Sequence, residues 1–328
     1  MVDLSIILPV YNHAPYIKQA IDSILMQKVN FTYEVLIGED CSTDNSREIL
    51  KKIEKDLPSN FHIFYREKNM GGKGEGNFND LYKRMRGRYL IVLEGDDFWT
   101  YAYKLQKEYD FLEAHPDYIA VAHDTEVVDE HGNKMHWTYP CCRKSEYTIW
   151  DFRKGLLAGQ TTTIMVRNYM NDPSIDTRLL PSNFPGDRKK AFLFIANGRI
   201  RCFPEKWSAY RLVVTHGSSF SATSRLQPPD FKAPLDYYYS LYDYACKHNV
   251  DENVKLVTEQ LYFNYLFRIV LRKKINEISY KDLKGAFQKL RYPVRTSAYT
   301  IMQSLLWPYH KINGKIESIK YEKATGLR

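Results

Sequence analysis

A short apolar run that leads directly into three carboxylates is the feature that most constrains this chain. Residues 89–93 (YLIVL) are followed by Glu94, Gly95, Asp96 and Asp97. A continuous aliphatic run closed by a turn residue is typical of a buried parallel strand, and side chains just past the carboxyl end of such a strand face the ligand crevice of an open α/β sheet. The stretch therefore predicts a strand that ends in an acidic binding loop. A solvated acidic turn that only closes a strand is the alternative.

These acidic residues predict a metal site. Glu94, Asp96 and Asp97 cannot all stay ionised in so small a volume without a compensating cation, because like charges a few ångströms apart oppose one another's ionisation. A hard divalent ion, Mg²⁺ or Mn²⁺, suits carboxylate ligands, with its remaining positions filled by diphosphate oxygens and water.

The composition is that of an ordinary globular protein. The chain has 328 residues, 44% hydrophobic and 26% charged, which suits one large α/β domain with an appendage, or two modest domains, and argues against a disordered or fibrous chain. Its five cysteines form no C-x-x-C pair and no signal peptide is evident, so we expect a reducing cytosol and neither disulfides nor a zinc site. No apolar run approaches the roughly 18 residues that span a bilayer, which predicts a soluble or surface-bound protein.

The net charge of +8 is unevenly distributed, because basic residues crowd the last third of the chain among many tyrosines and phenylalanines. Nucleic acid or an anionic membrane surface could each use such a patch. No nucleic-acid-binding motif accompanies it, so we expect no nucleic acid partner; membrane contact is favoured over nucleic acid, and plain solvated helix faces over both. The basic residues are Arg268, Arg272, Lys273, Lys274, Lys281, Lys284, Lys289 and Arg291.

Strand and helix patterns alternate through the first hundred residues. Apolar runs at 4–10, 34–38 and 61–65 predict strands, and each is followed by a segment with helical spacing. In a parallel sheet the polar residues that end these strands lie at one edge, where a nucleotide-binding crevice is expected. The glycine-rich loop at 69–77 matches neither a P-loop nor a GxGxxG fingerprint and is first of all a flexible loop, although Lys73 and the backbone amides suit a phosphate.

After residue 99 the pattern becomes antiparallel and then helical. Asp187 opens an amphipathic helix at 188–197, where a carboxylate is either an N-terminal cap or a functional acid. From a break near residue 226 onward only helices are indicated, so we expect one domain at 1–225 and a helical region at 226–328. The other predicted elements are a helix at 104–115, a strand within 118–128, a hairpin into 134–139, strands at 161–166 and 199–203, and helices near 231–248, 253–273, 280–290 and 296–308.

Five short motifs, taken in order, resemble the family 2 inverting glycosyltransferases over residues 3–221. They are the first strand and its loop (SIILPVYN, 5–12), the acidic segment EDCSTDNS (39–46), the segment EGDD (94–97), Gly186-Asp187 before an apolar helix, and Tyr210-Arg211 before a Gly-Ser-Ser loop. The resemblance implies an α/β fold of GT-A type, in which helices flank a mostly parallel nucleotide-binding sheet, with a C-terminal helical appendage.

The resemblance also implies roles for individual residues. Tyr11 matches the position that stacks on the nucleotide base, within a motif that includes Pro9, and Asp40 the position that hydrogen-bonds the base. Lys73 lies where a basic residue meets the nucleotide. Glu94 and Asp96 match donor-binding acids, Asp96 and Asp97 the metal-binding acids, and Asp187 the catalytic base. Glu94 replaces the usual leading aspartate, and Glu39 the first acid of the earlier pair, so which acid touches the metal stays open.

The implied activity is metal-dependent, inverting transfer of a sugar from a nucleoside-diphosphate sugar, with a UDP-sugar as the expected donor. The implied acceptor is a hydroxyl of a glycan or lipid-linked glycan in surface polysaccharide synthesis. Two alternatives stay open: a sugar-nucleotide-binding or assembly protein without transfer activity, and a nucleotidyltransferase, which would want a glycine-rich basic signature where this chain has YNHAP at 11–15. We expect a cytoplasmic location; peripheral membrane contact at its inner face and a homodimer contact through helix faces are open alternatives.

Overall fold

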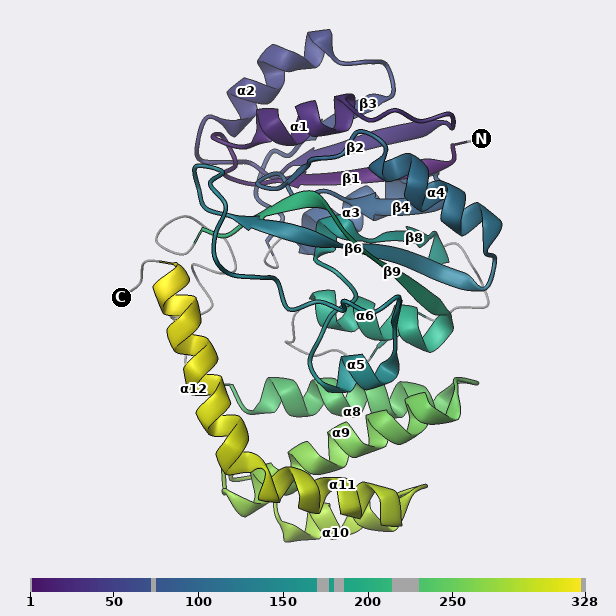
Figure 1. The fold of residues 1–328 in the computed structure, drawn as a ribbon, viewed down its shortest axis with the longest axis vertical. Helices are drawn as coiled ribbons and strands as arrows, with labels where there is room; N and C mark the ends of the chain where they lie inside the picture. The colour runs from purple at the N-terminus through teal and green to yellow at the C-terminus, as the bar shows by residue number, and fades with distance from the viewer. Residues whose placement is uncertain (1, 72–74, 170–176, 180–185, 214–229, 326–328) are drawn as a thin grey trace. The chain divides into compact units, whose positions relative to one another are not determined.

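A computed structural model describes residues 2–71, 75–169, 177–179, 186–213 and 230–325 (Figure 1). Within these ranges nine strands form one mixed sheet in the order β3-β2-β1-β4-β8-β6-β9-β5, with β7 paired to β9. The strands are β1 (Leu4–Val10), β2 (Tyr33–Glu39), β3 (Phe61–Tyr65), β4 (Tyr89–Val92), β5 (Phe98–Trp99), β6 (Tyr118–Val128), β7 (Glu146–Tyr147), β8 (Met165–Arg167) and β9 (Arg199–Arg211).

The parallel half of the sheet creates a switch point beside β1. From β1 the chain moves outward through β2 and β3, then returns to place β4 on the other side of β1, with all these pairings parallel. In such a sheet the loops after the two central strands leave in opposite directions, which opens a crevice at their carboxyl ends. The segment after β4, the acidic loop, therefore lies at this crevice.

Successive side chains of β1 point to opposite faces of the sheet, and helices pack on this half of the sheet through different sets of β1 side chains. Leu4, Ile6 and Leu8 belong to a buried cluster with apolar residues of three helices, α1 (Ile17–Leu25), α2 (Ser46–Ile53) and α4 (Lys104–Ala114). The helix α3 (Glu75–Arg84) packs on β1 and β2 through other residues. Buried Asn77 of α3 donates to the Gly38 carbonyl at 2.8 Å.

The other half of the sheet is mixed: β6 and β9 pair in parallel and the remaining pairs are antiparallel, so the predicted antiparallel pattern holds only in part. Two predicted strands also differ. The predicted strand at 134–139 is wrong: a single isolated bridge joins Val128 to Lys134, on the side of β6 that β9 leaves open, and the described segment then continues without any strand pairing. The predicted strand at 161–166 begins late, because the Gln160 side chain accepts a hydrogen bond from Thr162 N and closes a 3₁₀ turn, Thr161–Thr163, before β8.

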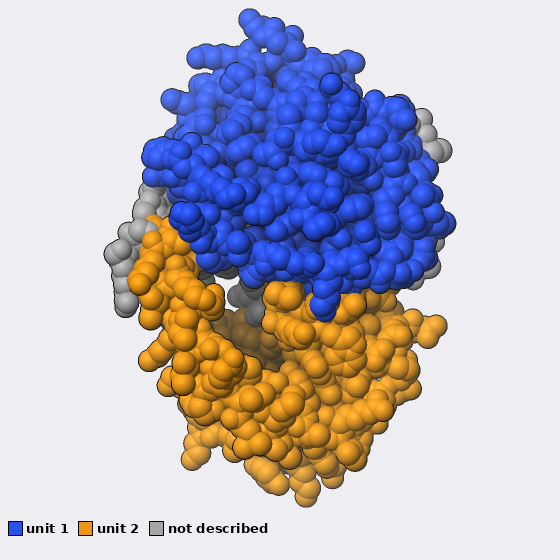
Figure 2. Space-filling model, viewed as in Figure 1, with its two compact units in different colours: residues 1–147, 157–175, 198–225 blue, residues 148–156, 176–197, 226–328 orange. Residues whose placement is uncertain are grey.

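Contacts between residues divide the chain into two compact units (Figure 2). The first comprises residues 1–147, 157–175 and 198–225, and the second 148–156, 176–197 and 226–328. The sheet lies in the first unit. The second unit joins two earlier segments to the C-terminal helices, so the units are not contiguous in sequence; the domain boundary near residue 226 stays a prediction.

Helices alone make up the regular structure described in the second unit. The four C-terminal helices predicted from the sequence are present, and a further one, α12, follows them. Among the described residues no helix is both long and apolar enough to cross a bilayer. The helices are α5 (Ile149–Arg153), α6 (Gly186–Asn197), α8 (Lys232–Lys247), α9 (Glu252–Leu271), α10 (Tyr280–Gln288), α11 (Pro293–Leu305) and α12 (Trp307–Ala324).

A buried ion pair joins two turns of α4 beneath the sheet. Lys104 Nζ donates to Glu108 Oε2 at 2.7 Å and lies 4.7 Å from the centroid of the Trp99 ring. His123 of β6 completes the cluster, with its Nε2 3.7 Å from Glu108 Oε1. Burial raises the pKa of Glu108 to about 7 and lowers the pKa of both Lys104 and His123. The charges of Lys104 and Glu108 therefore compensate each other in the buried interior.

Removing one partner of this pair should be costly. Lys104→Met leaves the Glu108 carboxylate buried without its cation, and we expect the free energy of unfolding to fall by about 3–5 kcal/mol at pH 8. The double variant Lys104→Met/Glu108→Leu removes both charges and should recover most of the loss. Urea unfolding of the parent and both variants measures the difference.

The pH dependence gives a second readout with a defined sign. A carboxyl group whose pKa is raised by folding costs stability as pH rises from its unfolded pKa, about 4.5, to its folded pKa. The Lys104→Met variant should therefore regain stability as pH falls from about 8 to 5, relative to the double variant. A single variant as stable as the parent at pH 8 would contradict the paired arrangement.

Candidate active site

Pro9, near the end of β1, and Tyr11, just after it, lie at the edge of the sheet. Pro9 pairs with Gly38 of β2 but lies beyond Ile7, the last β1 residue paired with β4, so its missing N–H costs no ladder bond on that side. Tyr11 follows the strand and is half-buried. Asn12 then takes a left-handed backbone conformation, φ 59°, which asparagine tolerates better than most residues.

Side chains of the loop after β2 hold the backbone of the loop after β1. Four contacts link the two loops: three satisfy backbone N–H groups of the loop after β1, and the fourth satisfies the N–H of Thr43 in the loop after β2. They are Asn12 N to Ser42 Oγ at 3.0 Å, His13 N to Ser46 Oγ at 2.8 Å, Ala14 N to Asp44 Oδ2 at 3.0 Å, and Thr43 N to Asn12 Oδ1 at 2.8 Å. Ser42 and Asp44 thus fix the segment that carries Tyr11.

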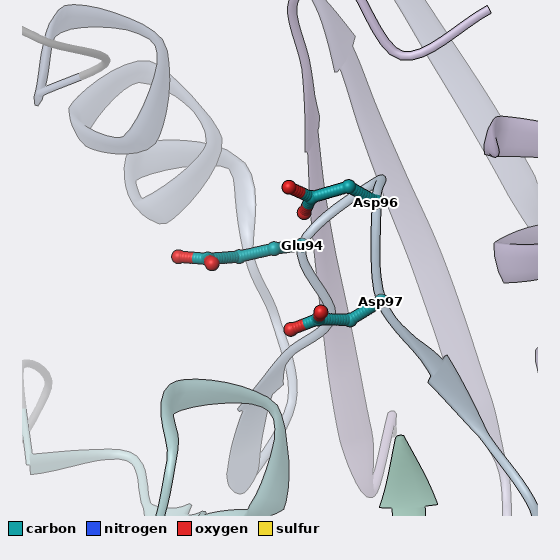
Figure 3. Close-up of side chains that lie close together, drawn as sticks. All are labelled: Glu94, Asp96 and Asp97. Atoms are coloured by element: carbon teal, nitrogen blue, oxygen red, sulfur yellow. The ribbon is translucent and has the colours of Figure 1, made fainter. Parts of the chain in front are cut away.

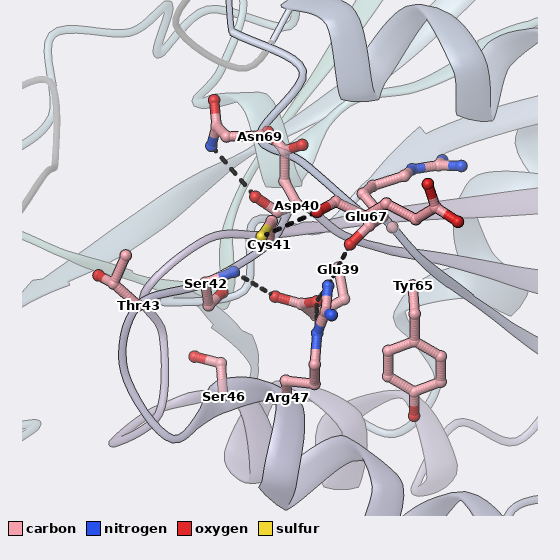
Figure 4. A network of polar contacts seen from close by, with 12 residues as sticks. Glu39, Asp40, Cys41, Ser42, Thr43, Ser46, Arg47, Tyr65, Glu67 and Asn69 are labelled. Carbon is pink, nitrogen blue, oxygen red and sulfur yellow. Dashed lines mark hydrogen bonds and ion pairs between the residues drawn. The ribbon is translucent and has the colours of Figure 1, made fainter.

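Glu39 and Asp40 end β2 in different roles (Figure 4). Glu39 is buried and both of its carboxylate oxygens are used: Oε1 accepts from Ser42 N at 2.6 Å, and Oε2 accepts from Arg47, which neutralises it. Glu39 therefore acts as a support for the loop. The Glu39 side chain, which is longer than the aspartate usual at this position of the family, contacts Arg47 of α2 and does not extend into the crevice.

Asp40 ties the end of β2 to the beginning of the glycine-rich loop. Its Oδ1 accepts from Met70 N at 2.8 Å, and its carbonyl accepts from the Asn69 amide at 3.1 Å. Burial raises the pKa of Asp40. The predicted base-binding acid is thus held rigidly at the sheet edge. Lys73, the predicted phosphate contact in the same loop, lies outside the described residues.

The three acids after β4 converge as the sequence predicts (Figure 3). One carboxylate oxygen from each of Glu94, Asp96 and Asp97 lies within 4.8 Å of the others. Only glycine fits between them: a Cβ on Gly95 would come within 2.5 Å of His13 Nδ1. The close approach of Gly95 to the loop after β1 therefore lets the acidic loop lie against the end of that strand.

Asp97 is the buried anchor of this cluster. Its Oδ1 accepts from Arg211 N at 2.8 Å, and its Oδ2 accepts from Gln160 Nε2 at 2.9 Å. Burial, together with the negative charges of Asp96 and Glu94, raises the pKa of Asp97 well above its usual range. Each oxygen of a carboxylate keeps a second lone pair after one such bond, so Asp97 still has acceptor capacity for a cation.

Arg211 fixes the acidic loop from the end of β9. Besides its backbone bond to Asp97, its Nε donates to the Asp96 carbonyl at 2.9 Å and its Nη2 to Gln19 Oε1 of α1 at 2.7 Å. Its guanidinium lies over the Tyr16 ring, 4.4 Å from the centroid. In the sequence Arg211 belongs to one of the family motifs, but the motif predicts no role for it. No sequence pattern indicates a functional role for Gln160, which precedes a run of threonines.

The cluster suits a hard divalent cation. Asp96 is partly exposed, and no hydrogen bond to its carboxylate is found within the described part of the chain. It stands beside an anchored, buried Asp97 and a third carboxylate, which gives an oxygen-only ligand set with surplus negative charge. Mg²⁺ and Mn²⁺ prefer such ligands. The residues present therefore fit the predicted metal.

Asp187 lies in the second unit, at the start of α6. Its Oδ1 accepts from the N–H of the adjacent Arg188 at 2.7 Å, which is a contact within the first turn of α6, whereas an N-terminal cap accepts from the second or third residue after it. Arg188 in turn fixes this end of the helix: its Nη1 donates to the Gly155 carbonyl at 2.8 Å, and its guanidinium lies 4.8 Å from the centroid of the Phe152 ring. Tyr237 of α8 donates to the Arg188 carbonyl at 3.1 Å. Asp187 is thus presented by a well-held helix end.

Gln160 gives a test of how the acidic cluster is supported. Its amide orientation is fixed because Oε1 accepts from Thr162 N, which turns Nε2 toward Asp97. Outer hydrogen bonds of this kind typically change metal affinity by about 10- to 100-fold. Gln160→Leu should therefore weaken Mn²⁺ binding by about that factor, measured by calorimetric titration of the purified protein.

A second buried glutamine supplies the matched control. Gln27 is buried and bonds to the Tyr101 carbonyl and to Leu105 N, away from the acidic loop. Gln27→Leu should lose comparable folding stability and keep the Mn²⁺ affinity of the parent. Equal Mn²⁺ affinity in the two variants would show that Gln160 has only a structural role.

The sequence model described as Glycosyl transferase family 2 matches residues 5–171, just over half of the chain. The chain belongs to glycosyl transferase family 2. The matched range contains the loops after β1, β2 and β4 and all three acids of the cluster. The predicted family is confirmed.

Relatives of known sequence differ in how much of the chain they match. An uncharacterized protein of Mycobacterium tuberculosis is 30% identical over 215 residues, which cover 63% of this chain and 58% of that protein. The putative teichuronic acid biosynthesis glycosyltransferase TuaG of Bacillus subtilis is 37% identical over 109 residues, 33% of this chain and 41% of TuaG. The match thus spans less than two thirds of either relative's length.

Solved structures show the same fold. Staphylococcus aureus TarS 1–349 in complex with UDP-GlcNAc has a TM-score of 0.58 at 20% identity, covering 82% of this chain and 72% of TarS 1–349. The mannosyltransferase PcManGT of Pyrobaculum calidifontis, in complex with GDP-Man and Mn²⁺, has a TM-score of 0.52 at 13% identity and covers 99% of this chain and 86% of its own. The predicted α/β fold of GT-A type with C-terminal helices is confirmed.

Proposed function

We propose that this chain is a metal-dependent inverting glycosyltransferase that moves a sugar from a nucleoside-diphosphate sugar to an acceptor hydroxyl. The observation that carries the proposal is the convergence of Glu94, Asp96 and Asp97 at the switch point of the sheet, with Asp97 anchored from two sides. Membership of glycosyl transferase family 2 supports it.

The donor nucleotide is assigned to the ends of β1 and β2. Tyr11, next to Pro9, would stack on the base, and Asp40 would accept a hydrogen bond from it. The Asp40 carboxylate is rigid because Met70 N holds one oxygen, so the other is presented in a fixed orientation. Lys73 is proposed to meet the phosphates. A UDP-sugar is the proposed donor, supported by the fold shared with TarS, which was solved with UDP-GlcNAc.

Asp96 and Asp97 are the proposed metal ligands, with Glu94 beside them to reach the metal or a sugar hydroxyl. A bound Mn²⁺ or Mg²⁺ neutralises the charge that develops on the leaving diphosphate. The protein contributes the geometry: Gln160 and Arg211 N keep the Asp97 carboxylate in one orientation, and Arg211 Nε holds the Asp96 carbonyl. The cluster is then preorganised before the donor binds.

Asp187 is the proposed general base. It would accept the proton of the acceptor hydroxyl as that oxygen attacks the anomeric carbon from the side opposite the diphosphate, which inverts the configuration. The bond from Arg188 N to Oδ1 orients the carboxylate and leaves Oδ2 to take the proton. The proposed acceptor is a glycan or lipid-linked glycan in surface polysaccharide synthesis, in line with the name of the relative TuaG.

The metal assignment predicts coupled binding. Asp96→Ala should weaken binding of UDP in the presence of Mn²⁺ by at least about 10-fold, because the diphosphate loses its link to the protein, and should leave metal-free binding unchanged. Calorimetry with and without Mn²⁺ measures both. Equal binding of UDP with and without Mn²⁺ in the parent protein would refute the metal assignment.

The base assignment predicts a selective loss of turnover. Asp187→Asn keeps an acceptor for Arg188 N but removes the base, so turnover should fall by at least about 10²-fold while donor affinity and stability stay near normal. Asp251→Asn is the matched control, because Asp251 caps α9 through a bond from Asn253 N. Parent-like turnover in Asp187→Asn would mean that Asp187 only stabilises the start of α6.

A further inference from the structure

The helix α11 is inverted: it buries hydroxyl side chains and exposes large apolar ones. Thr296 and Thr300 face the protein and are 0% and 3% exposed. On the outer side Val294 is 81% exposed and Leu305 76%. Soluble helices normally bury their apolar side, so the exposed side of α11 has the chemistry of a surface that meets something else.

The inverted side is fixed by bonds to α9. Buried Glu259 of α9 accepts from Arg291 N at 2.6 Å, from Tyr292 N at 3.1 Å and from Thr296 Oγ1 at 2.6 Å. These bonds hold the first turn of α11 with its threonine side inward. The helix cannot rotate its apolar side into the unit without leaving a buried carboxylate without donors, which is costly.

The exposed stripe continues along α12, none of whose residues is buried. On α12 itself Tyr309, Ile312, Ile316 and Ile319 recur at intervals of three and four, so they lie on one side of that helix. Nine of the sixteen large apolar side chains that are exposed in the described ranges belong to this stripe. We call it the C-terminal apolar face: Val294, Ile301, Met302, Leu305, Leu306, Tyr309, Ile312, Ile316 and Ile319.

Basic side chains surround this face. Residues 268–328 contain fourteen Lys and Arg against four Asp and Glu, so they hold more than the whole net charge of the chain. On α11 and α12 themselves the exposed cations outnumber the two acids, Glu317 and Glu322. The exposed cations are Arg295, Lys311, Lys315, Lys320 and Lys323. Apolar residues flanked by lysines are the composition of a helix that lies in a membrane interface.

We propose that the C-terminal apolar face binds the surface of an anionic lipid bilayer. The apolar side chains would enter the boundary between headgroups and acyl chains, and the surrounding lysines would meet the negative headgroups. A second copy of the chain fits less well. The spacing suits a helical partner, but α11 and α12 carry five exposed cations against two acids, so two copies would bring an excess of like charge together, whereas paired helices place opposite charges there.

The contact would keep the protein beside a membrane whatever sugar it transfers. Binding to lipid requires neither a donor nor the acidic cluster, so the proposal goes beyond the transfer reaction and fails or stands independently of it. It would also account for the excess of basic residues in the C-terminal region without a nucleic acid partner.

Sedimentation of the full chain with vesicles tests the proposal. Vesicles of phosphatidylcholine with about 30% phosphatidylglycerol are compared with pure phosphatidylcholine, at about 0.05 M and about 0.5 M salt. We expect at least about 10-fold tighter binding to the anionic vesicles at low salt, and most of this difference lost at high salt. A protein that stays in the supernatant with anionic vesicles at low salt, or that binds both vesicles equally, would overturn it.

Variants on opposite sides of α12 locate the contact. Ile312→Ser/Ile316→Ser removes apolar area without changing charge and should weaken binding by at least about 10-fold. Ser318→Asn, on the other side of the helix, is the control and should bind like the parent. None of these residues is buried, so folding is preserved.

Two results with these variants would overturn the proposal. One is parent-like binding of the double variant. The other is a dimer, detected by sedimentation velocity, that dissociates in the double variant while neither protein binds vesicles; that result would assign the face to a second copy.

Discussion

The buried carboxylate of Asp97 is the interaction on which the rest of the site depends. Placing an acid away from water beside two other acids is unfavourable unless donors and a cation compensate it. The chain supplies two donors, Gln160 Nε2 and Arg211 N, from segments that follow the acidic loop far along the sequence. Gln160 immediately precedes the 3₁₀ turn before β8, and Arg211 is the last residue of β9. These two elements therefore bring the donors to Asp97.

The parallel half of the sheet gives this anchored acid its neighbours. Because β1 lies between β2 and β4, the segments that carry Tyr11, Asp40 and Asp96 end at one edge. Side chain–backbone bonds between loops, and the close approach of Gly95 to His13, then fix those segments against each other. The fold thus brings together the residues proposed to bind the nucleotide and the metal, which come from three different strand ends.

The second unit separates two duties along its helices. Its earlier segments present Asp187 at a helix end that Arg188 and Tyr237 hold. Its last two helices expose large apolar side chains, and the bonds of Glu259 fix the orientation of the first of them, α11. Such rigidity is expected where a side chain must meet a substrate or a surface, because ordering it beforehand avoids an entropic cost on binding.

The sequence by itself determined the parallel strands, the acids at their ends, the helix that begins near Asp187 and the family, because apolar periodicity and short motifs are local properties. Only the tertiary structure decided which groups support those acids: the partners of Asp97 are 63 and 114 residues away, and no local spacing encodes such a pairing. It also decided that residues 134–139 leave the sheet and that α11 buries its threonines. In α11 a distant residue, Glu259, overrides the local apolar pattern, because the buried hydrogen bonds that it accepts from the start of this helix have no substitute in the local chain.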